Sequence, residues 1–215
     1  MKFRFLTLLI VLGFTLISFK GYSDVTFDEY FKDKTMRLDY YHTGTATEEH
    51  FSLDQMVNDG IWAGSKTQLV DDLELGKYLF EIQDPSSGEV LYSRGYSSIY
   101  GEWETTPEAE KEWGVFHESI RFPWPKEEVK VVIYKRNEQQ DFDPIWSYKL
   151  DPKHRKVNKS ELNNPYDVYN VVENGDPHNK VDIVVLSEGY TEDEMDEFRK
   201  DADKFADALL STEPF

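Results

Sequence analysis

Apolar and polar residues alternate with a period of two at several places between residues 36 and 150. This alternation is typical of β-strands that bury one face. It is clearest where Met36, Leu38, Tyr40 and His42 alternate with Arg37, Asp39 and Tyr41. The pattern therefore predicts a strand over residues 36–42, with its even-numbered side chains in a core.

Two pairs of similar segments are separated by turn-forming residues. Asp84-Pro85-Ser86-Ser87-Gly88 is one such turn cluster, and the polar stretch 137–143 is the other. Turn chemistry between two strand-like runs indicates a hairpin. The predicted hairpins join residues 78–82 to 90–96, and residues 129–134 to 145–150.

Residues 115–122 predict a further strand, which we expect Pro123 and Pro125 to end because proline cannot donate a ladder hydrogen bond. Thr106-Pro107-Glu108 predicts the start of one short helix, with proline at its first position. Short strands at this spacing, without long helices between them, favour a mainly β fold. We expect an antiparallel β-sandwich over residues 24–150.

The pattern changes after residue 150. Residues 151–164 are polar and locally basic, which is typical of a solvated linker. Residues 168–172 predict a short strand, and the almost wholly apolar stretch 181–186 predicts a strand buried on both faces. We therefore expect an α/β unit over residues 165–215.

A helix is predicted to follow from Thr191 to about residue 210. Thr191 and Glu194 have the spacing of a capping box. Apolar residues then recur at steps of three and four, so one helix face is apolar. They are Met195, Phe198, Ala202, Phe205 and Leu209.

The strand predicted at residues 181–186 needs cover on both of its faces, and the single helix that follows covers only one of them. We therefore expect a truncated unit, with the chain forming the front part of a longer protein. The alternative is that the unit docks on the sandwich and completes a small protein.

The N-terminus predicts export. Lys2 and Arg4 precede a nearly unbroken apolar run of 14 residues, which is short for a membrane span of about 20 residues. This arrangement is typical of a signal peptide, here residues 1–23, so we expect a periplasmic, cell-surface or secreted protein without stable membrane insertion. An uncleaved N-terminal anchor is the alternative.

Composition excludes several classes of protein. The chain has 42 acidic and 24 basic residues, a formal net charge of −18 and no cysteine. This negative charge would repel the phosphates of a nucleic acid, which argues against nucleic-acid binding. The absence of cysteine excludes disulfides, thiolate nucleophiles and cysteine-ligated zinc. With 39% hydrophobic residues, the chain has enough apolar side chains for a packed core.

The second unit resembles the opening of the catalytic domain of the IgA-peptidase family of zinc metallopeptidases, family sixty-four. The resemblance rests on residues 171–177, on residues 181–191, and on the amphipathic helix together with Pro214-Phe215 after it. The preceding sandwich resembles that family's N-terminal domain at 40–44 and 120–125. The resemblance implies a zincin-type peptidase that hydrolyses protein substrates, with zinc in the parent protein.

Zincin-type enzymes bind zinc through H-E-x-x-H on a helix. That motif is absent here, because no two of the five histidines are four residues apart. In the nearest stretch, His117-Glu118-Ser119-Ile120-Arg121, an arginine replaces the second histidine and the pattern is a strand. We therefore assign no catalytic or metal-binding residue in this chain. The missing catalytic domain is expected to be a partner of the sandwich, and the fragment itself is expected to be inactive.

The loop after residues 181–186 is a candidate substrate cleft, since ligands favour the C-terminal ends of such strands. Glu188 and Tyr190 are its candidate residues. Ser187 lacks the glycine two residues before it that a nucleophile elbow requires.

A different class of function stays open. Tryptophans at positions 103, 113, 124 and 146 fit a sandwich core, but they also fit a stacking platform for sugars. The alternative function is a free-standing extracellular glycan- or protein-binding module. An exposed, coplanar row of tryptophans would favour it.

Overall fold

The computed structural model describes residues 25–163 and 166–214. The predicted signal peptide at residues 1–23 lies outside these described residues. No helix in the described part of the chain is long and apolar enough to cross a membrane.

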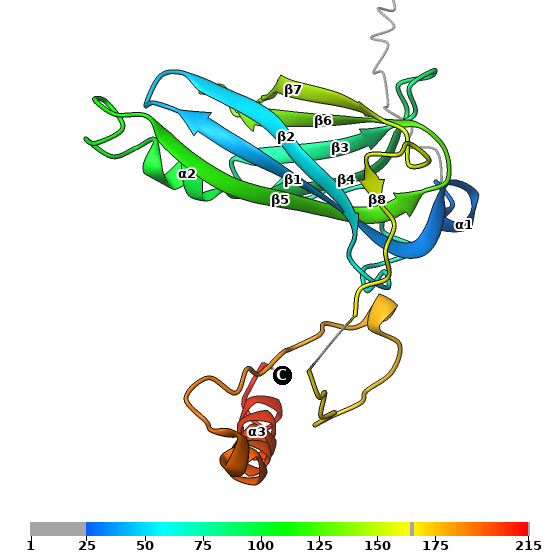
Figure 1. Ribbon diagram of the computed structural model, residues 1–215, viewed down its shortest axis with the longest axis vertical. Helices are drawn as coiled ribbons and strands as arrows, with labels where there is room; N and C mark the ends of the chain where they lie inside the picture. Colours follow the sequence, from blue (N-terminus) through cyan, green and yellow to red (C-terminus); the bar gives the residue numbers. More distant parts are fainter. Residues whose placement is uncertain (1–24, 164–165, 215) are drawn as a thin grey trace, which may run out of the picture.

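The described residues form a β-sandwich followed by a segment whose regular structure is helical (Figure 1). The strands are β1 (Phe31–Gly44), β2 (Glu49–Asn58), β3 (Tyr78–Gln83), β4 (Val90–Tyr96), β5 (Gly114–Pro125), β6 (Val129–Arg136), β7 (Phe142–Leu150) and β8 (Val157–Asn158). The helices are α1 (Phe27–Tyr30), α2 (Ile99–Trp103) and α3 (Met195–Leu210), with 3₁₀ turns η1 (Pro177–Asn179) and η2 (Glu192–Glu194).

Two four-stranded sheets make the sandwich, in the orders β5-β1-β2-β8 and β4-β3-β6-β7. All neighbours are antiparallel except β2 and β8. The prediction of a mainly β, antiparallel sandwich is confirmed. The core lies between the sheets, where the even-numbered residues of β1 that were predicted to be buried meet Tyr78, Phe80 and Ile82 of β3.

Both predicted hairpins are present, as β3–β4 and β6–β7. The turn chemistry acts as expected in the first, where the Asp84 carboxylate accepts hydrogen bonds from the backbone N–H groups of Ser86 and Ser87. Gly88 follows with a φ of 76°, which glycine adopts without strain.

Two local predictions in the sandwich are wrong. Strand β5 continues through Pro123 to Pro125, paired with Thr35 and Phe31 of β1. It is an edge strand, so its prolines remove no hydrogen bond that a second neighbour needs. The short helix expected at Thr106 is a turn, and the helix forms earlier, at α2, where the Ser98 hydroxyl accepts from the Gly101 N–H.

The segment predicted as a linker contributes one short strand. Val157 and Asn158 of β8 pair with Met56 and Val57 of β2, and Val157 is buried. The Asn58 side chain donates to the Ser160 carbonyl, 3.2 Å away. Part of residues 151–164 is therefore held against the sandwich.

The strands predicted in the second unit do not form. Residues 168–172 and 181–186 have no strand partner among the described residues, and Val181, Val184 and Leu186 are 76–88% exposed. The expectation that 181–186 is buried on both faces is therefore wrong for this structure. A strand forms only where a neighbouring strand accepts its hydrogen bonds, and the described residues offer none there.

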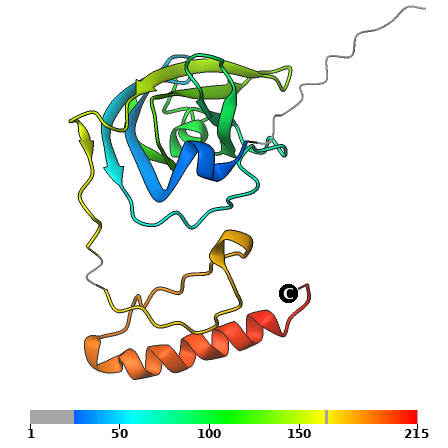
Figure 2. The same ribbon diagram turned by 90° about the vertical axis from the view of Figure 1, so that its right-hand side faces the viewer.

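The predicted helix is confirmed as α3, although the residues directly after Thr191 form the 3₁₀ turn η2 and α3 itself begins at Met195. Glu194 accepts hydrogen bonds from both the backbone N–H and the hydroxyl of Thr191, so the predicted capping box is present. Both ribbon views show α3 lying apart from the sandwich (Figure 2). Its apolar face is incompletely covered, since Ala202 is buried while Phe205 is half exposed.

Candidate functional site

The predicted cleft residues lie in the loop before η2. Glu188 is exposed, and Tyr190 is half-buried. The Tyr190 hydroxyl donates to Asp201 of α3 at 2.9 Å, and its ring packs edge-on against Phe198. Tyr190 therefore fixes the loop to α3. A substrate contact for either residue stays a prediction.

The most concentrated polar chemistry lies inside the sandwich, around His42 of β1. This imidazole is fully buried. Its Nδ1 lies 3.2 Å from Glu118 of β5, and its Nε2 lies 2.9 Å from Glu49 of β2. Because both ring nitrogens face carboxylates, the arrangement favours the doubly protonated imidazolium.

Aromatic rings enclose the imidazole. The ring of His42 stacks on Phe51 at 4.1 Å and on Tyr100 at 3.9 Å, measured between ring centroids. Tyr78 meets it edge-on. Gly44, two residues along β1, leaves room for Tyr100, because a Cβ there would lie 2.5 Å from the Tyr100 hydroxyl oxygen.

The charges continue from β2 to the other sheet. Lys135 of β6 lies 2.6 Å from Glu49 and 2.8 Å from Glu104, and Lys77 also pairs with Glu104. Three cationic groups thus face three carboxylates, counting His42, Lys77 and Lys135 against Glu49, Glu104 and Glu118. We call these six residues the His42 network. It joins the two sheets at the end of the sandwich covered by α2 (Figure 1).

The pKa shifts follow from this geometry. Burial alone would lower the pKa of His42, but the hydrogen bonds to Glu118 and Glu49 outweigh it and raise the pKa. Burial alone would raise the pKa of Glu49 and of Glu118. Their hydrogen bonds, chiefly with His42, outweigh it and lower both values. Each partner therefore stabilises the charged form of the other.

Because His42 is sealed from solvent, it has no access to a substrate. The described residues contain no buried side-chain polar atom without a hydrogen-bond partner, so the network is satisfied. Through Lys135 of β6 and Glu49 of β2, it connects one sheet to the other.

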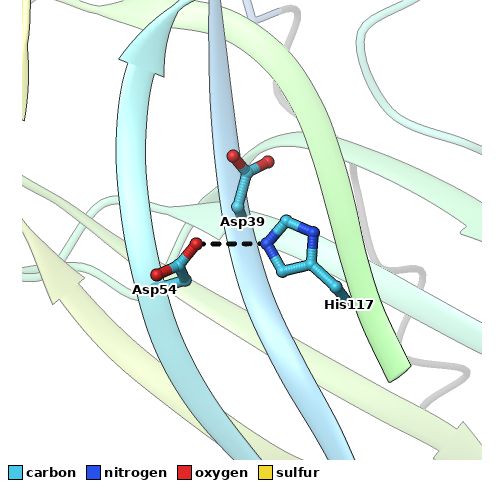
Figure 3. Close-up of side chains that lie close together, drawn as sticks. All are labelled: Asp39, Asp54 and His117. Carbon is cyan, nitrogen blue, oxygen red and sulfur yellow. Dashed lines mark hydrogen bonds and ion pairs between the residues drawn. The ribbon is translucent and has the colours of Figure 1, made fainter. Parts of the chain in front are cut away.

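A second group lies on the outer face of the same sheet. Asp39 of β1, Asp54 of β2 and His117 of β5 place one ligand atom each within 4.8 Å of one another (Figure 3). His117 Nε2 is 3.1 Å from Asp54 Oδ2, the contact drawn as a dashed line. Within residues 25–163 and 166–214, these three side chains are the group of histidine and acidic residues whose ligand atoms lie close enough together to hold a metal ion.

This group was not predicted from the sequence. The sequence pattern placed His117 on a strand face, which is correct. A search for histidines four residues apart, however, cannot detect a group whose members come from three different strands. The group depends on the register in which His117 pairs with Tyr41 and Asp39 pairs with Gln55. No spacing in the sequence carries that register.

The tryptophans do not form the platform that glycan binding would favour. Trp124 is buried, Trp103 and Trp146 are half-buried, and Trp113 is exposed. Trp146 packs against Tyr40 and Phe51. An exposed row of tryptophans is absent from the described residues, which counts against the stacking-platform alternative.

Comparison with known proteins gives two matches in order along the chain. The model for the Peptidase M64 N-terminus matches residues 26–147, and the model for IgA Peptidase M64 matches residues 169–215. A search of curated proteins finds no match. The first match covers the sandwich except the end of β7 and strand β8, and the second covers the exposed apolar stretch and α3. The chain therefore belongs to the M64 IgA-peptidase family, with the family's N-terminal domain followed by a segment of its peptidase domain.

Proposed function

We propose that the chain is the N-terminal region of an exported zinc metallopeptidase that hydrolyses protein substrates. In this proposal the sandwich is an accessory domain, and residues that follow Phe215 supply the zinc ligands and the catalytic groups. The observation that carries it is the order of the two family matches, N-terminal domain first and peptidase domain second.

The exposed side chains of the second unit support the proposal. Residues 181–186 present Val181, Val184 and Leu186 to solvent, although this stretch is apolar enough for a buried strand. Fully burying one such side chain is worth about 1.5–3 kcal/mol. Further strands of the peptidase domain would cover these residues, and the parent's catalytic domain is thus the proposed partner of this segment.

The test compares this chain with a version extended by the residues that its gene encodes after Phe215, about two hundred of them for one domain. We expect the extension to contain H-E-x-x-H, to add bound zinc and to hydrolyse a protein substrate. The control replaces the glutamate of that motif with glutamine, which removes the group that polarises the attacking water. An extension without the motif and without hydrolysis would overturn the proposal.

Export is proposed on the pattern of residues 1–23. The measurement is the mass of the protein recovered outside the cytoplasm of a host that recognises the signal. We expect the chain to begin at Asp24. An intact Met1 on the exported protein would indicate an uncleaved anchor, and full retention in the cytoplasm would contradict export.

A further inference from the structure

We propose that Asp39, Asp54 and His117 form a binding site for one divalent transition-metal ion, and zinc is the ion to test first. The site belongs to the sandwich, so it is separate from the zinc proposed for the catalytic domain. It would revise the expectation that no residue of this chain binds a metal.

A β-bulge assembles the site. Asp39 pairs with Gln55, but the next residue of β1, Tyr40, pairs with Leu53, so Asp54 is an extra residue in β2. The extra residue lets Asp54 and Gln55 both lie on the outer, exposed side of the sheet. Bulges re-aim side chains in this way, often beside functional sites. Without it, Asp54 would not reach both Asp39 and His117.

The distances are close to those of metal ligands. Zinc–ligand bonds of about 2.0–2.2 Å place neighbouring ligand atoms on a tetrahedral ion roughly 3.3 Å apart. His117 Nε2 and Asp54 Oδ2 already lie 3.1 Å apart, and all three ligand atoms lie within 4.8 Å. Asp54 and His117 are 35% and 49% exposed at their side chains, so small rotations can close the remaining gap.

Neighbouring residues hold Asp39 in place. Arg37 donates to both carboxylate oxygens of Asp39, at 2.8 and 3.1 Å, and Gln55 donates to Oδ2 at 2.9 Å. A carboxylate has about four acceptor sites, so three are used and one is left for an ion. Hydrogen bonds of this kind orient the ligands of established metal sites.

The local charge also favours a cation. Arg37 and Arg121 both pair with Asp59, at 2.6 and 2.7 Å. Arg37 also pairs with Asp39, whereas Asp54 pairs with no arginine or lysine among the described residues. The carboxylate charge of Asp54 is therefore not offset by an arginine or lysine, and a bound divalent ion would offset it.

The ligand types select the class of ion. One imidazole with two carboxylates suits zinc, manganese, cobalt or nickel, whereas calcium and magnesium take oxygen ligands. Because His117 and Asp54 are exposed, the remaining coordination positions are open to water or to a group of another molecule.

The experiment is calorimetric titration of the whole chain with zinc, with H117Q and D54N as the test variants. Both residues are on the surface, so these variants are expected to fold, whereas Asp39 also anchors Arg37. The matched control is H50Q, because His50 is also exposed and lies 2.7 Å from the carboxylate of Glu48, but has no third ligand within reach.

We expect saturable binding of one zinc ion by the unsubstituted chain and by H50Q. We expect each test variant to bind about tenfold more weakly or worse. Cobalt in place of zinc should give the visible absorption of a coordinated ion, and H117Q should lose it. Absence of one-to-one binding, or equal weakening by H50Q and H117Q, would overturn the proposal.

Discussion

Substitution of His42 by phenylalanine tests how much the His42 network stabilises the sandwich. Phenylalanine retains a planar ring between Phe51 and Tyr100, so most of the stacking is preserved. It removes the two contacts to Glu49 and Glu118. Hydrogen bonds to charged groups contribute about 1.5–3 kcal/mol each.

The expected loss is about 3–5 kcal/mol of the free energy of unfolding, because removing one member of a buried ion pair leaves its partner uncompensated. The loss of stability would be larger if Glu49 and Glu118 were left with no other partner. Glu49 keeps Lys135, however, and Glu118 keeps the Tyr40 hydroxyl and the Tyr100 N–H. For a domain of this size, the loss corresponds to a fall in Tm of roughly 10–20 °C.

The assay is urea unfolding followed by tryptophan fluorescence, with thermal unfolding as a second probe. His50→Phe is the matched control, because that histidine pairs with Glu48 in solvent and should change stability by no more than about 0.5 kcal/mol. A double variant with E118Q should lose less than the sum of the two single variants. If H42F lies within 1 kcal/mol of the unsubstituted chain, the network does not stabilise the fold as argued.

Three further outcomes are expected. The raised pKa of His42 contributes stability that is complete below pH 6.5 and is lost as the pH rises through the pKa of His42 in the folded protein. The lowered pKa of Glu118 contributes stability that is complete above pH 4.5 and is lost as the pH falls through the pKa of Glu118 in the folded protein. Urea titrations across pH should therefore show greatest stability between these values, and the alkaline fall should disappear in H42F. The exposed apolar residues 181–186 should bind a hydrophobic dye, and V184D should reduce the fluorescence while a sandwich-surface substitution, K149E, should not. T191A should destabilise the turn η2 that leads into α3, seen as faster amide exchange over residues 192–194, because it removes the hydroxyl from the capping box. Unchanged exchange would show that the box is unimportant.

The sandwich could be predicted where strand pattern and turn chemistry agreed. Asp84 and Gly88 marked one hairpin, and the alternation around Tyr40 identified the buried face of β1. Strand β2 was missed because its bulge at Asp54 interrupts the alternation on which the prediction depends. The end of β5 was predicted wrongly at Pro123 and Pro125. A proline ends a central strand but is tolerated in an edge strand, and which strands lie at an edge is a property of the whole sheet.

The sites were harder to predict for a related reason. The pattern placed His42 on the buried face, but its partners Glu49 and Glu118 belong to other strands, and only the register brings them together. The apolar stretch 181–186 shows the converse. Its composition favours a strand, yet a strand also needs neighbours, and local composition contains no information about them.

The most direct test of the whole account is hydrogen–deuterium exchange, measured by mass spectrometry on this chain and on the version extended beyond Phe215. We predict slow exchange over β1, β3 and β6 in both proteins. Over residues 181–186 we predict fast exchange in this chain and slow exchange in the extended protein, as new strands pair with that stretch. Equally fast exchange over residues 181–186 in both proteins would contradict the claim that they belong to an unfinished peptidase domain.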